Sequence, residues 1–137
     1  MKKRDLLKLS EEKGWNHISI YQKLSEDFIR EFQDKVNWRW ISYYQKLSEG
    51  FIREFQDKIN WNYVSEYQKL SEGFIREFQD KIDWDWISEY QKLSYNFIDD
   101  FQDKLDWEIL KERKLSKTIQ MGFAERFNKF IKEKNEL

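Results

Sequence analysis

Hydrophobic and polar residues alternate along this chain with the spacing of short amphipathic helices. After Ser25, apolar side chains fall at Phe28, Ile29, Phe32 and Val36, which share one helical face. The opposite face is charged, with acid-before-base pairs four residues apart that stabilise an exposed helix surface. Ser25 is a favourable N-cap, because its hydroxyl can accept a hydrogen bond from the first turn. The pattern predicts a helix that begins after Ser25 and runs through Val36.

A second helix, about ten residues long, is predicted to follow with almost no loop between the two. Asn37 is a second favourable N-cap. Trp38, Ile41 and Tyr44 follow it at helical spacing, and all three are assigned to the core. The pair therefore predicts two crossed or antiparallel helices that share one apolar interior.

The whole pattern recurs every 23 residues, and residues 44–59 are identical to residues 67–82. A short fixed period indicates stacked copies of one supersecondary unit. Helices this short have only marginal stability in isolation, so each pair must bury its apolar face against the next pair. Polar residues beside the apolar stripes need partners, and we expect Gln33, Ser42 and Gln45 to bond across repeats. The period is marked by Trp15, Trp38, Trp61, Trp84 and Trp107; the N-caps recur at Ser25, Ser48, Ser71 and Ser94, and at Asn37, Asn60, Asp83 and Asp106, with Gly14 before the first tryptophan.

The predicted fold is all-α: a short α-solenoid of tandem 23-residue helix pairs, forming a single repeat domain over residues 1–137. The repeats are assigned to 15–37, 38–60, 61–83 and 84–106. Residues 1–14 are predicted to form an N-terminal capping helix in which Leu6 and Leu9 keep apolar positions. Residues 107–137 are predicted to form a half-repeat, with Arg113 where a tyrosine is expected, and a longer capping helix that begins at Ser116. The apolar stripe of that capping helix is Phe123, Phe127, Phe130 and Ile131.

Composition narrows the classes of function. The 25 basic and 26 acidic residues leave a net charge of −1. This charge provides no overall electrostatic field that would attract nucleic acid or an anionic membrane. Cysteine is absent, His17 is the single histidine, and the common nucleotide-binding and zinc-protease motifs are missing. We therefore expect a non-enzymatic protein with no catalytic, cofactor-binding or metal-binding residue. No apolar run is long enough to span a membrane, and the expected location is the cytoplasm.

Contact residues are sought where the repeats differ, because stacking explains the positions that they share. The second and sixth residues of the second helices vary, and they are predicted to form one outward row that is apolar or basic early and acidic late. The fourth repeat also differs at the start and in the middle of its first helix. The predicted partner-binding residues are Ile20, Arg39, Tyr43, Asn62, Glu66, Asp85, Glu89, Tyr95, Asp99 and Asp100. The acidic later part favours a partner protein with a basic patch.

Other interpretations stay open. The variable row is also what drift on a solvated surface produces. Tryptophan and tyrosine beside lysine could stack nucleic-acid bases or a nucleotide. Two carboxylates such as Asp99 and Asp100 could hydrolyse a glycoside if a cleft held them at the required separation. Finally, the chain is either a monomer or associates weakly through the ends of its stack.

The repeat WxxISxYQKLSExFIREFQDKI, over about residues 15–110, resembles the short aromatic repeats of proteins from large DNA viruses and bacteriophages. The resemblance implies a viral accessory protein in the host-cell cytoplasm that binds and inhibits a host or defence protein, with an anti-CRISPR-like role included. It assigns no catalytic residue to this chain.

Overall fold

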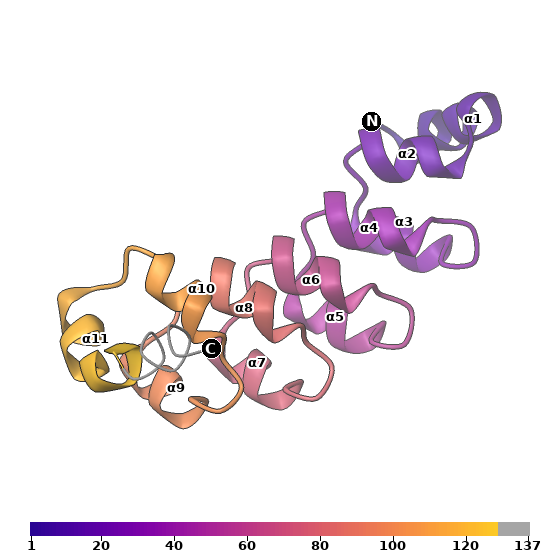
Figure 1. Ribbon diagram of the computed structural model, residues 1–137. Coiled ribbons are helices and arrows are strands. Elements are labelled where there is room, and N and C mark those ends of the chain that lie inside the picture. Colours follow the sequence, from indigo (N-terminus) through magenta and orange to yellow (C-terminus); the bar gives the residue numbers. More distant parts are fainter. Residues whose placement is uncertain (129–137) are drawn as a thin grey trace, which may run out of the picture. The chain divides into compact units, whose positions relative to one another are not determined.

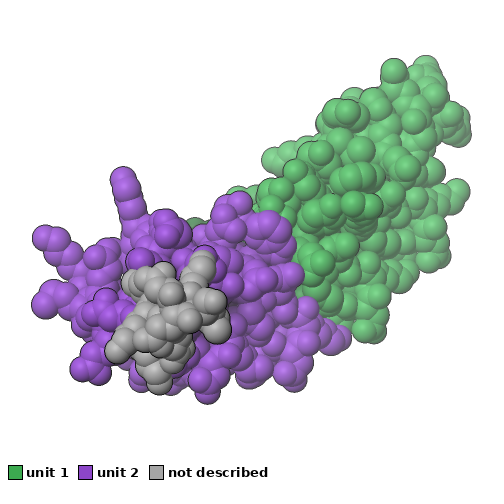
Figure 2. Space-filling model, viewed as in Figure 1, with its two compact units in different colours: residues 1–70 green, residues 71–137 purple. Residues whose placement is uncertain are grey.

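The computed structural model describes residues 1–128, which fall into two compact units. Unit 1 covers residues 1–70 and unit 2 begins at Ser71 (Figure 2). The single repeat domain predicted over residues 1–137 stays a prediction. In the described residues no helix has both the length and the apolar character that crossing a membrane requires.

The described chain is all-helical, and its helices follow one another in regular pairs, which confirms the predicted helical solenoid. In unit 1, α4 packs against both α2 and α6, so these three helices succeed one another along one side of that unit (Figure 1). In unit 2, α10 packs against α8. The helices of unit 1 are α1 (Lys3–Lys13), α2 (Trp15–Tyr21), α3 (Glu26–Glu31), α4 (Trp38–Tyr44), α5 (Glu49–Glu54) and α6 (Trp61–Tyr67). Those of unit 2 are α7 (Glu72–Glu77), α8 (Trp84–Tyr90), α9 (Tyr95–Asp100), α10 (Trp107–Glu112) and α11 (Lys117–Gly122), with residues 124–128 also helical.

Both helices of each repeat are shorter than predicted. The first ends at Glu31 rather than Val36, because Phe32 leaves helical geometry with φ −109° and ψ 31°. A turn over residues 32–36 follows, closed by a hydrogen bond from the Val36 N–H to the Phe32 carbonyl at 3.1 Å. The second helix has seven residues and ends at Tyr44, since Gln45 is extended. The expectation of almost no loop between the two helices was therefore wrong.

The predicted N-caps are confirmed. The Ser25 hydroxyl accepts a hydrogen bond from the Phe28 N–H at 3.0 Å, and the Asn37 side chain accepts one from the Trp40 N–H at 3.2 Å. The same bonds recur at the other serine, asparagine and aspartate caps. Gly14 stands before α2 at φ 91°, a conformation that favours glycine because a Cβ atom would be strained there. Helices of six or seven residues depend on such caps and on packing rather than on intrinsic propensity.

The tryptophan rings pack the helix that each of them begins on the helix that follows it, within one assigned repeat. The Trp38 ring lies 6.1 Å from Phe51 and 5.0 Å from Phe55, measured between ring centroids. Its indole N–H donates to the Gln33 carbonyl at 2.9 Å, so the polar edge of the ring is satisfied. The fully buried centre is aliphatic and phenylalanine-rich: Ile18, Ile29, Ile41, Phe51, Ile52, Val64, Phe74, Ile75, Ile87, Phe97, Ile98 and Leu110.

The tyrosine at the end of each second helix is exposed, which overturns its assignment to the core. Tyr44 is 49% exposed, whereas Ser42 is fully buried and Gln45 is 5% exposed. Because the helix stops at Tyr44, the extended Gln45 turns inward and the tyrosine ring stays at the surface. The four exposed tyrosines of this type are Tyr21, Tyr44, Tyr67 and Tyr90.

Buried glutamines bond neighbouring repeats together, as the sequence predicted. The Gln45 amide donates to the Ser19 carbonyl at 2.9 Å and to the Gln22 carbonyl at 2.7 Å. Its oxygen accepts from the Leu24 N–H at 2.9 Å. Gln68 repeats all three bonds one repeat later, and we call this series the glutamine ladder. It satisfies backbone groups at places where the helix geometry has ended.

The predicted bonds of Ser42 and Gln33 are also present. The Ser42 hydroxyl accepts from the Asn60 N–H of the next repeat at 2.9 Å and donates to its own repeat at Trp38. The Gln33 amide donates to the Arg30 carbonyl of its own repeat, and its oxygen accepts from Lys58 of the next repeat at 3.1 Å. Gln33, Ser42 and Gln45 therefore each bond across repeats.

Arg113 takes the place of a ladder glutamine in the last half-repeat. Its guanidinium donates to the Ser88 carbonyl at 2.6 Å and to the Gln91 carbonyl at 2.8 Å, the pair of positions that a glutamine binds in unit 1. Its assignment to the tyrosine position was wrong, because α10 is one residue shorter than α8 and Arg113 directly follows it. Burial lowers the pKa of the Arg113 guanidinium, and the charge of Glu89 opposes this.

The terminal helices partly match the prediction. At the N-terminus, α1 packs on α2 and buries Leu6, while Leu9 is half-buried. At the other end, Ser116 caps α11 as predicted, but α11 stops at Gly122 and the longer helix is interrupted. Phe123 is buried and Phe127 lies 5.1 Å from Trp107. The predicted core residues Phe130 and Ile131 lie outside the described residues.

Candidate functional site

The candidate site is a group of aromatic rings on the solvent side of α4 and α6. We call it the aromatic patch and define it as Trp40, Tyr43, Tyr44, Tyr63 and Tyr67. Helical spacing produces it, because residues three and four apart lie on the same face. The packing of α4 on α6 then brings the two sets of rings together within unit 1.

Tyr43 is the centre of the patch. Its ring centroid lies 4.3 Å from that of Tyr44, 5.0 Å from that of Tyr63 and 4.1 Å from that of Tyr67. The hydroxyl of Tyr67 also donates to the hydroxyl of Tyr43 at 3.0 Å. Tyr43 is therefore fixed by neighbours from both helices, and it was among the predicted partner-binding residues.

Arg39 lies against the edge of the patch. Its guanidinium carbon is 5.0 Å from the Trp40 ring centroid and 5.6 Å from that of Tyr63. One guanidinium nitrogen donates to the Tyr63 hydroxyl at 3.1 Å. The two rings are nearly parallel, at 19° and 6.5 Å between centroids. The cation is thus held over two aromatic faces, each of which attracts it electrostatically.

Glu66 lies beside the patch and places a negative charge next to Tyr67. The pKa of the Tyr67 hydroxyl is raised, first by the hydrogen bond with Tyr43, then by burial and by the Glu66 carboxylate. The hydroxyl acts as a hydrogen-bond donor to the Tyr43 hydroxyl. A surface that combines rings, one arginine and phenol donors can bind apolar and polar groups together.

The predicted row is divided between the two units. Arg39, Tyr43 and Glu66 lie at the patch in unit 1, whereas Ile20 is half-buried on α2 and Asn62 is exposed on α6. The residues Trp40, Tyr44, Tyr63 and Tyr67 were not among the predicted partner-binding residues, and the Tyr44 type was assigned to the core. The variation at the Trp40 and Tyr63 position was a usable signal, but the exposure of Tyr44 and Tyr67 depended on where the helices end.

Asp85 and Glu89 are exposed on α8 in unit 2. The pKa of the Asp85 carboxyl is raised by burial, and then by the negative charges of Asp106 and Asp83. Glu89 borders a shallow pocket of about 330 Å³ that Ile109 and Arg113 also line. Within the described residues, no cluster of histidine and carboxylate side chains has the arrangement of a metal site.

The predicted residues on α9 make bonds that belong to the stack. Asp100 pairs with Arg76 at 2.8 Å, and Asp99 accepts from the Gln102 amide at 2.8 Å. The Tyr95 ring stacks on Phe123 at 4.7 Å and 28°. These three side chains therefore have structural partners within unit 2.

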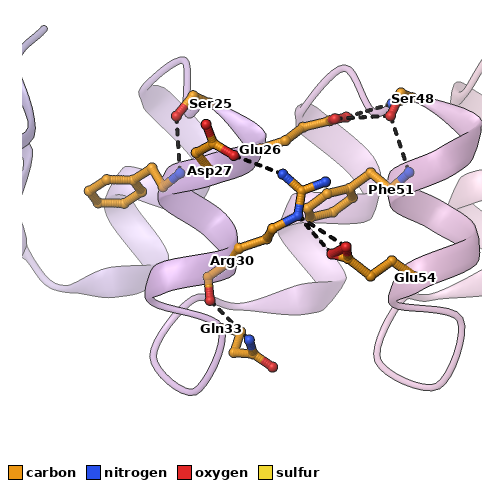
Figure 3. A network of polar contacts seen from close by, with 9 residues as sticks. Ser25, Glu26, Asp27, Arg30, Gln33, Ser48, Phe51 and Glu54 are labelled. Carbon is orange, nitrogen blue, oxygen red and sulfur yellow. Dashed lines mark hydrogen bonds and ion pairs between the residues drawn. The ribbon is translucent and has the colours of Figure 1, made fainter.

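The arginine pairing is part of a second series, which is seen most fully between α3 and α5 (Figure 3). The Arg30 guanidinium lies 5.3 Å from the Phe51 ring centroid and pairs with Glu54 at 2.7 Å. Its pKa is raised above the usual arginine value, chiefly by the hydrogen bond to Glu54. Glu26 reaches the next cap in the same direction, accepting from the Ser48 N–H at 2.7 Å and from its hydroxyl at 2.9 Å.

The repeat that begins at Trp15 thus contributes a glutamate and an arginine to contacts with the repeat that follows. Glu72 and Arg76 make the corresponding bonds to Ser94 and Asp100. In α9 the position of the glutamate is occupied by Tyr95 and that of the arginine by Asp99. The positions that the glutamate and the arginine of the preceding repeat contact are still a serine, Ser94, and a carboxylate, Asp100. The differences in the fourth repeat therefore coincide with the end of this series.

Comparisons with known protein families, with curated proteins and with solved structures find no match to this chain.

Proposed function

We propose that this chain is a non-enzymatic scaffold whose repeats present the aromatic patch to a partner protein. The observation that carries the proposal is the joint exposure of Tyr44 at 49% and Tyr67 at 46% beside Trp40, Tyr43 and Tyr63. Large rings exposed together form a surface that gains free energy when a partner covers it. Tyrosine, tryptophan and arginine are also the residue types that dominate binding energy at protein interfaces.

The rigidity of the patch supports the same proposal. Tyr43 touches three other tyrosines, and Arg39 is held by Trp40 and Tyr63. Side chains that are already ordered lose less conformational entropy on binding, so more of the contact energy appears as affinity. The host or defence partner implied by the viral resemblance belongs to this proposal, and so does a basic partner surface that meets Glu66.

A matched pair of double variants tests the proposal. Tyr44→Ala with Tyr67→Ala removes the two most exposed rings of the patch. Tyr21→Ala with Tyr90→Ala removes two exposed tyrosines from the same helix position outside it. Proteins captured by the wild-type chain would be identified, purified and measured by titration calorimetry against all three chains. We expect the patch variant to weaken binding by at least about 30-fold, the loss of one interface hot spot, and the control variant to change little.

Equal binding by the two double variants would contradict the proposal, provided that both keep the wild-type circular dichroism spectrum. Full binding by the patch variant together with loss in the control would instead assign the contact to other parts of α2 or α8. Either outcome removes the patch as the binding surface.

Single-stranded nucleic acid is a second candidate, favoured by the near-parallel Trp40 and Tyr63 rings with Arg39 over both. Such rings can stack bases, and an adjacent arginine can meet a phosphate. A filter-binding series with a fluorescent oligonucleotide at several salt concentrations tests it. Binding that weakens with salt and is lost in Trp40→Ala would support nucleic acid, whereas no binding at low salt would eliminate it.

A further inference from the structure

The contact between Tyr43 and Tyr67 joins two different repeats through their phenol groups. Tyr43 belongs to α4 and Tyr67 to α6. Their ring centroids are 4.1 Å apart with an interplanar angle of 41°, and their hydroxyl oxygens are 3.0 Å apart. The carbons on either side of each hydroxyl are therefore close to the same carbons of the other ring. Tyr67 is 46% exposed, so a dissolved reagent can reach the pair.

We propose that Tyr43 and Tyr67 are a site of oxidative modification, at which a one-electron oxidant joins α4 to α6 through a dityrosine bond. Suitable oxidants are the high-valent iron of a peroxidase supplied with hydrogen peroxide, or a photogenerated ruthenium(III) complex. The proposal concerns a covalent state of the chain and does not depend on any partner protein.

The reaction is balanced without further reagents. Each phenol gives one electron to the oxidant and its hydroxyl proton to solvent, which leaves two tyrosyl radicals. The radicals couple through the ring carbons next to the hydroxyls, forming one carbon–carbon bond. Each coupled carbon then passes its hydrogen to the ring oxygen, which restores both phenols. Two electrons and two protons leave in total, so the product has two hydrogen atoms fewer than the starting chain.

Geometry favours this pair over the neighbouring tyrosine. The Tyr44 ring is 4.3 Å from that of Tyr43, but the hydroxyl of Tyr43 receives its hydrogen bond from Tyr67. Tyr63 meets Tyr43 edge-on at 77°, and its hydroxyl accepts from Arg39 instead. The pair with Tyr67 combines a short ring separation with direct contact of the two hydroxyls.

The test is brief photo-oxidation of the purified full chain with tris(bipyridine)ruthenium(II), persulfate and visible light, followed by trypsin and mass spectrometry. Cleavage at the neighbouring lysines and arginines places Tyr43 in peptide 40–46 and Tyr67 in peptide 59–69. We expect a joined species whose mass is the sum of these peptides less two hydrogen atoms, in the fraction that runs as monomer. Fragmentation should place the new bond between Tyr43 and Tyr67.

Phenylalanine variants supply the controls, because they keep each ring and remove only its hydroxyl. Tyr43→Phe and Tyr67→Phe should each reduce the joined species to background, while Tyr44→Phe and Tyr63→Phe should leave it. Persistence of the joined species in Tyr67→Phe would overturn the proposal. So would a product that lies mainly within peptide 40–46 or mainly between separate chains. Circular dichroism of each variant before oxidation establishes that the compared chains are folded.

Discussion

The Tyr95 ring lies directly over Gly122, at a distance that leaves no room for a Cβ atom on that glycine. The same ring stacks on Phe123, so α9 and the end of α11 meet through a close approach that requires glycine. Gly50 and Gly73 stand in the first turns of α5 and α7 with open space or ordinary contact around the position of a Cβ atom. The three glycines therefore respond differently to the same substitution.

We predict that Gly122→Ala lowers stability, because the added methyl group must displace the Tyr95 ring from Phe123. The expected loss is about 1 kcal/mol, the scale of one aromatic pair. Gly50→Ala and Gly73→Ala should instead raise stability by about 0.4–1 kcal/mol each, since they restrict the unfolded chain without a clash. Urea unfolding followed by circular dichroism measures all three, and stabilisation by Gly122→Ala would contradict the packing described here.

A second prediction concerns the glutamine ladder. Gln45→Ala removes three hydrogen bonds and leaves the buried Leu24 N–H without its acceptor. We expect a loss of about 2–4 kcal/mol, because an unsatisfied buried group is costly in addition to the lost bonds. Gln22, at the same position of the first repeat, is half-buried, and in the described part of the chain its side chain makes no ladder bond.

Gln22→Ala is therefore the matched control for Gln45→Ala and should change the unfolding free energy by less than about 1 kcal/mol. Thermal unfolding of the two variants in one buffer makes the comparison. Similar losses at the two positions would mean that the side-chain volume matters rather than the ladder bonds.

A third prediction tests whether the repeats are modular. Deleting residues 24–46 removes one complete period and joins Lys23 to Leu47, which restores the sequence pattern at the junction. Because each repeat mainly contacts its neighbours, the shortened chain should fold with a single cooperative transition and lower stability. Trp40, Tyr43 and Tyr44 are lost with the repeat, so this variant is also a folded chain without the centre of the patch. Absence of a cooperative transition would contradict modular stacking.

A fourth prediction follows from the raised pKa of Asp85. A carboxyl whose pKa is higher in the folded chain binds its proton more tightly there, so stability falls as pH rises through its titration range. Asp85→Asn should therefore raise the melting temperature at pH 7, and the gain should shrink below about pH 4, where aspartate is protonated in the unfolded chain too. Asn16 and Asn62 already occupy this position in other repeats. Asp103→Asn, at another exposed carboxylate of unit 2, is the control, and an equal gain there would point to net charge.

Local signals in the sequence predicted much of the fold. The Ser25 and Asn37 caps depend on neighbours three residues away, and the structure confirms them. The burial of Ile29 and Ile41 follows from helical spacing and is also confirmed. The position of Tyr44 could not be obtained in this way, because it depends on the residue at which the helix stops.

The functional surface was harder to predict for a related reason. Arg39 and Tyr43 were identified because they vary between repeats, and the structure places them at the patch. Tyr95, Asp99 and Asp100 vary as well, but their bonds reflect the end of a series of contacts between repeats. Variation between copies therefore has two physical sources, an exposed surface and a terminus, and one sequence does not separate them.

The helix α9 lacks the glutamate and the arginine that earlier repeats use to contact the next repeat. This affects how the array can lengthen by duplication of repeats. A duplicated repeat inserted before α9 brings with it the glutamate and arginine that its successor needs, so internal lengthening requires no new contact. A copy added after α9 would find Tyr95 and Asp99 in their place. The substitutions at Tyr95 and Asp99 thus make the fourth repeat an unsuitable template for a further copy, whereas the repeats before it carry both side chains.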